Sequence, residues 1–260
     1  MGLIDGLKEL VREQREFGHP LVRRAARAAT SAYRRFRDAR AIVTDADRRA
    51  VLLLRLLRPG DVHQTTPLTW RDRYPEIFAR CARALQVRED IHLLSYGCST
   101  GEEVLTLRQY FPDAHITGAE INPRNLALCR RLPVDGRIVF VPSEHAAIEE
   151  RGPFDLIFCM AVLQRTPHAV EAQRMTSLSA IYPFEKFDRQ VSELDSFLKT
   201  GGVLVIHHTQ YVFTDASVAT TYDVVPSLEP PANDGPRFDR NSRLVESAVS
   251  SGSIYRKRSS

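Results

Sequence analysis

The chain has 260 residues, of which 43% are hydrophobic and 26% are charged, with a formal net charge of +4. This length suits one globular domain with an appendage, and no apolar run approaches the roughly 20 residues needed to span a bilayer. The four cysteines are irregularly spaced and match neither a zinc pattern nor a secreted disulfide framework, so no metal is expected. The N-terminus lacks the apolar core of a signal peptide, and the sequence therefore predicts a reduced, cytoplasmic protein without membrane insertion.

The charge is unevenly distributed. Residues 1–60 contain fourteen Lys/Arg and seven Asp/Glu, a net of +7, whereas the remaining residues have a net of −3. Such a basic segment could meet nucleic acid, an anionic membrane surface or an acidic protein. Solvated faces of arginine-rich helices are the simpler explanation, and we do not expect nucleic acid as a partner.

Apolar periodicity predicts helices over 3–17, 21–40 and 44–58. In the third, Thr44 with Asp47 three residues later resembles a capping box, and the leucines that follow imply burial against other helices. Residues 61–73 are expected to form a loop. The sequence therefore predicts an N-terminal helical cap with its connecting loop over 1–73, followed by a ligand-binding domain over 74–260.

The chain is organised around residues 91–120, a strand, a glycine turn (97–101), a helix and a second strand that ends on Glu120. The glycines let the backbone pass close under a ligand, and the helix begins with free N–H groups. A carboxylate at the end of the second strand can accept both hydroxyls of a ribose. This order of elements predicts a nucleoside site.

A dinucleotide needs three glycines, whereas this turn has only Gly97 and Gly101. Glu102 and Glu103 would repel a diphosphate but suit a ligand with a sulfonium and an ammonium. These features point to S-adenosylmethionine. An ordinary strand-to-helix turn without a ligand is the alternative.

The heptapeptide GCSTGEE at 97–103 resembles the first motif of class I methyltransferases, and most closely that of the chemotaxis-receptor glutamate methyltransferases. FDLIFC at 154–159 and LKTGGVLVI at 198–206 resemble the fourth and fifth strands of that family. The resemblance covers about 90–210 and implies a doubly wound, seven-stranded Rossmann-like α/β sheet that ends in an antiparallel strand pair. It implies that S-adenosylmethionine is held by the glycine turn, the next two strand ends and the turn after the fourth strand, namely Gly97, Cys98, Ser99, Thr100, Gly101, Glu102, Glu120, Ile121, Ser143, Glu144, Met160, Ala161 and Val162.

The remaining elements follow from apolar runs, prolines and glycines. We expect strands over 137–141, 155–159, 203–207 and 253–256, a further strand within 209–225, and helices over 75–85, 122–133, from Thr166-Pro167 onward and over 184–198. Thr200-Gly201-Gly202 is expected to stop the last helix.

Methyl transfer from a sulfonium depends mainly on proximity and orientation, which can supply about 7–11 kcal/mol, and a carboxylate acceptor needs no general base. Weak candidates for an active-site role are Arg71, Gln164, His168, His207 and Tyr211. Arg71 belongs, with Thr66, to a segment that faintly resembles one in the receptor methyltransferases, but Arg73 and Tyr74 interrupt the match. His207 and His208, as neighbours on a strand, should point to opposite faces and not chelate a metal together.

The sequence thus predicts an S-adenosylmethionine-dependent methyltransferase whose acceptor, a small molecule or a protein, is not identified. A protein-carboxylate methyltransferase of the chemotaxis type is the main alternative. A nucleic-acid methyltransferase would usually show an Asn/Asp-Pro-Pro-aromatic element where this chain has MAVL at 160–163. A non-catalytic module that binds the cofactor or a partner is the remaining possibility.

Overall fold

The computed structural model describes residues 44–64, 68–85, 90–226, 235–245 and 252–259. The helices expected over 3–17 and 21–40 lie outside these ranges. The chain forms two compact units, Met1–Leu57 and Arg58–Ser260. Residues 58–73 therefore belong to the unit that contains the sheet, while the predicted role of 1–73 as a cap remains a prediction.

In the first unit, the described helix is α3 (Ala46–Leu57). Its cap is Asp45, one residue later than predicted: Asp45 Oδ1 accepts hydrogen bonds from the backbone N–H groups of Asp47 (2.9 Å) and Arg48 (3.2 Å). Of its leucines only Leu54 is buried, and Leu57 is 76% exposed. The leucines were expected to be buried against other helices, but among the described residues most of them are exposed.

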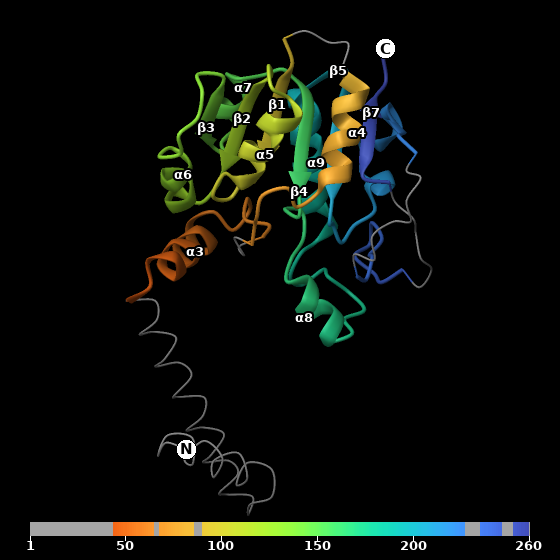
Figure 1. Ribbon diagram of the computed structural model, residues 1–260. Coiled ribbons are helices and arrows are strands. Elements are labelled where there is room, and N and C mark those ends of the chain that lie inside the picture. The colour runs from red at the N-terminus through yellow and green to blue at the C-terminus, as the bar shows by residue number, and fades with distance from the viewer. Residues whose placement is uncertain (1–43, 65–67, 86–89, 227–234, 246–251, 260) are drawn as a thin grey trace, which may run out of the picture. The chain divides into compact units, whose positions relative to one another are not determined.

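The second unit is built on a seven-stranded sheet in the order β3-β2-β1-β4-β5-β7-β6 (Figure 1). β7 runs antiparallel to both β5 and β6, and the other neighbouring strands are parallel. This confirms the doubly wound sheet with an antiparallel terminal pair. The strands are β1 (His92–Tyr96), β2 (His115–Glu120), β3 (Ile138–Pro142), β4 (Phe154–Met160), β5 (Leu198–His207), β6 (Tyr222–Val224) and β7 (Ile254–Lys257).

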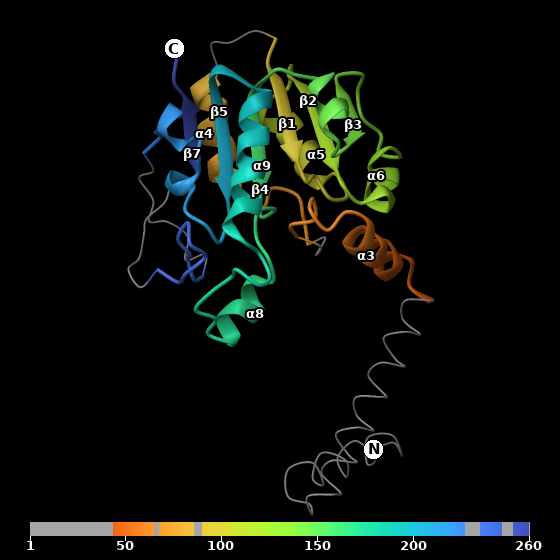
Figure 2. The same ribbon diagram turned by 180° about the vertical axis from the view of Figure 1, so that it is seen from behind.

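Helices cover both faces of the sheet, because neighbouring strand residues point to opposite faces. In β1, Leu93 packs in one hydrophobic core and Leu94 in the other. The first core is completed by α4 (Pro75–Leu85), α5 (Glu102–Tyr110) and α6 (Pro123–Cys129). The second is completed by α7 (His145–Glu149), α8 (Pro167–Ala172) and α9 (Phe184–Phe197). Figure 1 shows α4 and α5 in front of the sheet, and Figure 2 shows α9 in front of its other face.

Several elements differ from the sequence expectation. α9 ends at Phe197 and β5 starts at once at Leu198, so Thr200-Gly201-Gly202 lies within the strand instead of stopping the helix. The pairing with β4 shifts there, from Phe154↔Leu198 to Leu156↔Val203, and the extra residues are accommodated in this irregularity. The short helix α7 was not expected, and β6 occupies only the end of the segment proposed for a sixth strand.

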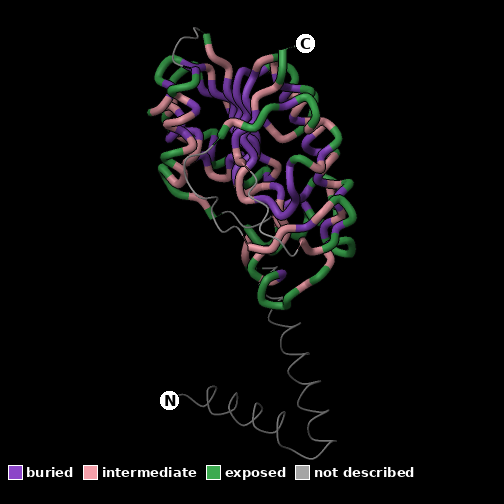
Figure 3. The backbone as a smooth tube through the Cα atoms, turned by 90° about the vertical axis from the view of Figure 1, so that its right-hand side faces the viewer, coloured by how far each residue is buried: buried purple, intermediate pink, exposed green. Residues whose placement is uncertain are grey.

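Burial is concentrated in the sheet, as the purple strands of Figure 3 show. All four cysteines are buried and free. Burial raises the pKa of Cys81 to about 12 and also raises the pKa of Cys159. The pKa of Cys98 is raised by its hydrogen bond with Cys129 and, after that, by burial. Among the described residues, no helix combines the length and apolar character that crossing a membrane would require.

Candidate cofactor site

The glycine turn after β1 is fastened to the end of β2. The backbone N–H groups of Gly97 and Cys98 both donate to the carbonyl of Ala119, at 2.8 and 3.0 Å. Gly97 and Gly101 have φ angles of 76° and 98°, in the left-handed region that favours glycine. A Cβ at Gly97 would lie 2.5 Å from Val162 Cγ2, and one at Gly101 would lie 2.5 Å from Leu132 Cδ1. Both glycines therefore make room for side chains of the protein itself, in addition to shaping the turn.

Glu120 ends β2 with its carboxylate held by the backbone. One oxygen accepts from the N–H of Ser99 (2.8 Å) and the other from the N–H of Asn122 (2.7 Å). Burial nevertheless raises the pKa of Glu120 to about 7, against the lowering effect of these hydrogen bonds. A ligand diol that donates to this carboxylate would favour its ionised form. The group predicted to hold the ribose is thus fixed in place between the glycine turn and α6.

Ser99 supplies a second polar group in the same turn. Its Oγ atom is buried and has no hydrogen-bond partner among the residues that the structure describes. A buried hydroxyl without a partner costs free energy, and such atoms call for an explanation. Together with Glu120, the side chain fits a polar, hydroxyl-bearing ligand such as S-adenosylmethionine.

The two acids that begin α5 have different environments. Glu102 accepts a hydrogen bond from Thr100 Oγ1 (2.6 Å) and remains partly exposed. Glu103 accepts from Ser95 Oγ (2.7 Å), and burial raises its pKa to about 7. Glu103 is therefore hydrogen-bonded to β1, and the expectation of an acid near the ligand ammonium rests on Glu102.

The residues that follow β3 contact the end of β2 and also Arg58, which precedes the loop at 61–73. The N–H of Ser143 donates to the carbonyl of Glu120 (3.1 Å), beside the partly buried Ile121. Arg58 reaches the same place: its Nη2 donates to Ser143 O (3.4 Å), and its Nη1 lies 3.5 Å from Glu144 Oε1. Sequence reasoning did not identify Arg58, because nothing in its local pattern links it to β3.

The residues after β4 turn sharply toward β5. Met160 is buried, and Ala161 has a φ of 57° and donates its N–H to the carbonyl of His207 (2.8 Å). Val162 packs against Gly97. The structure thus brings the residues predicted after the fourth strand against the first turn.

His207 and His208 were expected to point to opposite faces of the sheet, but their rings lie side by side. Their ring centroids are 4.2 Å apart, and the ring of Tyr74 lies 5.1 Å from His207 and 5.4 Å from His208. The reason is the backbone of His208, whose φ of 52° ends the alternation of the strand. His207 Nδ1 is 2.8 Å from Ser253 Oγ.

The other candidates lie in separate places. Arg71 and His168 are exposed, and Gln164 Nε2 donates to the carbonyl of Ala161 (3.1 Å). Tyr211 is fully buried and its hydroxyl lies 2.9 Å from Ser242 Oγ, and burial raises its pKa to about 12. Thr66 lies outside the described residues.

A cationic cluster, Arg165, Lys186 and Arg189, was missed by sequence reasoning. These side chains donate to carbonyls of residues 59–63, with Lys186 Nζ at 2.8 Å from Pro59 O and 2.7 Å from Val62 O. Burial, Arg165 and Arg189 together lower the pKa of Lys186 to about 8, and only the more weakly acting Asp61 raises it. The spacing of Lys186, Arg189 and Gln190 could have indicated this cluster, because it puts the three side chains on one face of the predicted helix.

The segment 59–63 is also anchored through His63, which is 3% exposed. Its Nε2 lies 3.2 Å from Gln190 Oε1, which can only accept, so Nε2 carries the proton. Nδ1 then accepts from the hydroxyl of Tyr182 (2.8 Å). Burial lowers the pKa of His63 to about 3, so the imidazole remains neutral.

Comparison with known proteins identifies a family for the part of the chain that contains the sheet. The sequence model of a family described as "Methyltransferase domain" matches residues 88–230, more than half of the chain. The trans-aconitate 2-methyltransferase of Methylobacterium nodulans is 33% identical over 94 residues, which are 36% of this chain and 34% of that protein. The match therefore spans about a third of the length of this curated relative.

Two solved structures are similar over part of the chain. One is CalS10, an amino pentose methyltransferase of Micromonospora echinaspora with bound SAM, with 25% identity over 56% of this chain and 52% of its own, and a TM-score of 0.38. The other is the plantazolicin methyltransferase BpumL in complex with SAH, with 13% identity over 76% and 60% of the two chains and a TM-score of 0.39. Because the family model matches more than half of its length, the chain belongs to the methyltransferase-domain family.

Proposed function

We propose that this protein methylates a carboxylate of a small anionic acceptor. The observation that carries the proposal is the cationic cluster. Arg165 follows β4 and Lys186 and Arg189 lie in the first turns of α9, so all three belong to the carboxyl edge of the sheet, where ligands of such folds bind. Of the charges that act on Lys186, two are positive and one is negative, which favours an anion nearby.

The residues of the chain would divide the work between the two ligands. Glu120 would accept the ribose hydroxyls, and the turn 97–101, with the hydroxyl of Ser99, would lie along the methionine part. When bound, the cofactor supplies an electrophilic methyl carbon on a sulfonium, which leaves as a neutral thioether. Arg165, Lys186 and Arg189 would orient the carboxylate, which is already ionised near neutral pH and needs no general base.

The name of one relative supports the same acceptor class. The M. nodulans protein is a trans-aconitate methyltransferase, and aconitate is a tricarboxylate.

The test is an acceptor screen with S-adenosylmethionine labelled in the methyl group. Small di- and tricarboxylates, a primary amine and a phenol are offered separately, and the product is treated with alkali. A carboxyl methyl ester releases volatile labelled methanol, whereas an N-methyl amine or an aryl methyl ether does not. Alkali-labile label in the acid-soluble fraction with a carboxylate alone supports the proposal, and stable label with the amine or phenol contradicts it.

The cationic cluster gives a second, independent readout. Arg189→Gln should raise KM for the carboxylate about tenfold or more, as for loss of a charged hydrogen bond, while the affinity for S-adenosylhomocysteine stays unchanged. Arg137→Gln is the matched control, because Arg137 is an exposed arginine whose side chain lies 3.9 Å from Asp113. An unchanged KM for the carboxylate in Arg189→Gln would show that the cationic cluster does not bind the acceptor.

A protein glutamate methyltransferase of the chemotaxis type is the second candidate. The heptapeptide GCSTGEE at 97–103 supports it. Its product would be equally labile to alkali but would precipitate with acid together with the acceptor protein. Label only in the precipitate would favour this candidate, and cofactor binding without turnover on any acceptor would favour a non-catalytic module.

A further inference from the structure

Two histidines stand side by side at the amino edge of the sheet. His92 begins β1 and His115 begins β2, and the two are paired residues in the parallel register of these strands. Residues paired in this way have side chains on the same face. Their rings are stacked, with centroids 4.9 Å apart and an angle of 19° between the planes.

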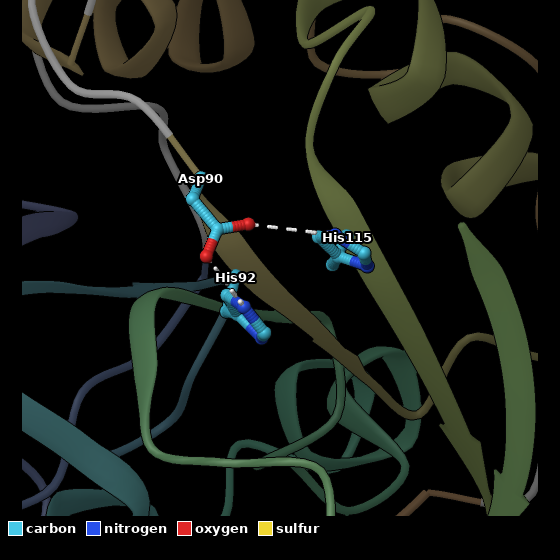
Figure 4. A group of neighbouring side chains, drawn as sticks. All are labelled: Asp90, His92 and His115. Carbon is cyan, nitrogen blue, oxygen red and sulfur yellow. Dashed lines mark ion pairs between the residues drawn. The ribbon is translucent and has the colours of Figure 1, made fainter.

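Asp90 brings a carboxylate to both rings, as Figure 4 shows. Its Oδ1 lies 3.4 Å from His115 Nε2, and its Oδ2 lies 3.8 Å from His92 Nε2. The φ of Asp90 is 53°, a left-handed conformation that aspartate tolerates better than most residues. The carboxylate therefore faces the same nitrogen of both imidazoles from a defined bend before β1.

We propose that Asp90, His92 and His115 bind a divalent transition-metal ion of the zinc type. The three ligand atoms all lie within 4.8 Å of one another. In a tetrahedral zinc site with bonds of about 2.0–2.2 Å, neighbouring ligand atoms are about 3.4 Å apart. The 3.4 Å between Asp90 Oδ1 and His115 Nε2 matches this spacing, and the 3.8 Å between Asp90 Oδ2 and His92 Nε2 is somewhat longer. Both separations exceed the roughly 2.7–2.9 Å of a charged hydrogen bond.

The donor set selects the class of metal. Two imidazoles and one carboxylate suit zinc and its neighbours, whereas magnesium prefers oxygen ligands in an octahedron. The side chains are partly or largely exposed, at 75% for Asp90, 33% for His92 and 45% for His115, so an ion can reach them and water can take a fourth position. Sequence reasoning missed the trio because the whole of α5 separates the two histidines along the chain.

The site lies at the opposite edge of the sheet from the cofactor site. β1 runs from His92 to Tyr96, directly before the glycine turn, so about 16 Å of strand separates the two. A metal there would link the beginnings of β1 and β2 to the bend that holds Asp90. Its role is therefore to stabilise the fold, and because the ion would bind only the folded chain, its presence should raise the temperature of unfolding.

The test uses the full chain without a polyhistidine tag, stripped with a chelator and titrated with zinc chloride in a calorimeter. The wild type should bind one zinc ion at this site, and its Tm should rise with zinc concentration but not with magnesium. His92→Gln and His115→Gln should each weaken binding about tenfold or more. Cobalt(II) added instead of zinc should show the intense visible absorption of tetrahedral coordination, and each variant should lose it.

His145→Gln is the matched control. His145 is also an exposed histidine between two carboxylates, 3.1 Å from Glu193 and 3.9 Å from Glu149, but within the described part of the chain no second imidazole completes that group. This variant should bind zinc like the wild type. If wild type takes up no zinc, or if His92→Gln and His115→Gln bind it as tightly as wild type, the site does not exist and the trio is only a pair of ionic contacts.

Discussion

Replacing Glu120 by glutamine should weaken cofactor binding and remove its dependence on pH. The carboxylate of Glu120 is buried at the end of β2 and would accept the two ribose hydroxyls. One charged hydrogen bond is worth about 1.5–3 kcal/mol. The loss of a single such bond therefore predicts an affinity for S-adenosylhomocysteine about 10- to 150-fold lower in Glu120→Gln.

The pH dependence follows from the raised pKa of about 7. The ligand binds the ionised carboxylate, which is about one tenth of the free protein at pH 6 and about nine tenths at pH 8. The affinity of the wild type should therefore rise about tenfold from pH 6 to pH 8. Binding at pH 6 should also release a proton, which calorimetry in buffers of different ionisation enthalpy can measure.

Glu103→Gln is the matched control for this experiment. Glu103 is half-buried near the same turn and its pKa is likewise raised to about 7, but its carboxylate accepts a hydrogen bond from Ser95 Oγ on β1. This variant should keep the pH dependence of the wild type. Thermal unfolding should accompany each titration, because Glu120→Gln also loses an acceptor for one backbone N–H. An affinity that stays flat with pH in the wild type, or a folded Glu120→Gln that binds normally, would refute the role given to Glu120.

Two further predictions concern stability. Gly97→Ala adds a Cβ 2.5 Å from Val162 at a φ of 76° and should destabilise the fold by about 1–3 kcal/mol, whereas Gly136→Ala, with no atom within 4 Å, should change it by less than about 1 kcal/mol in chemical denaturation. His63 is neutral when folded and gains a proton on unfolding below its usual pKa of 6.5, so its contribution to stability rises with pH up to that value. The stability advantage of the wild type over His63→Gln should therefore shrink by up to about 1.4 kcal/mol per unit as the pH falls from about 6 to 4, and urea titrations that show a constant difference would contradict this.

The framework of the sheet could be predicted because its signals are local. Apolar runs, the glycine turn at 97–101 and the acid at Glu120 follow one another within a short stretch, and each constrains the backbone directly. The boundary between α9 and β5 could not be predicted in the same way. Thr200-Gly201-Gly202 has the composition of a helix stop, yet pairing with β4 extends the strand through it.

The site itself was only partly predictable, since its remaining features depend on distant residues. Arg165, Lys186 and the carbonyls of 59–63 meet only in the folded chain. The approach of the His207 and His208 rings depends on one backbone angle, which no pattern of side chains reveals. Long-range contacts and single dihedral angles were therefore the information that the sequence pattern lacked.

The burial of all four cysteines has a practical consequence for experiments in solution. A thiol reacts as its thiolate, and burial both shields these sulfurs and raises the pKa values of Cys81 and Cys159. The pKa of Cys98 is raised by its hydrogen bond with Cys129 together with burial. The native chain should therefore react slowly with maleimides, and a single cysteine introduced at the exposed position of Gly136 should be labelled selectively. Fluorescent or paramagnetic probes can then be attached without first removing the natural thiols. The rate at which the natural thiols are labelled would measure how often the core opens.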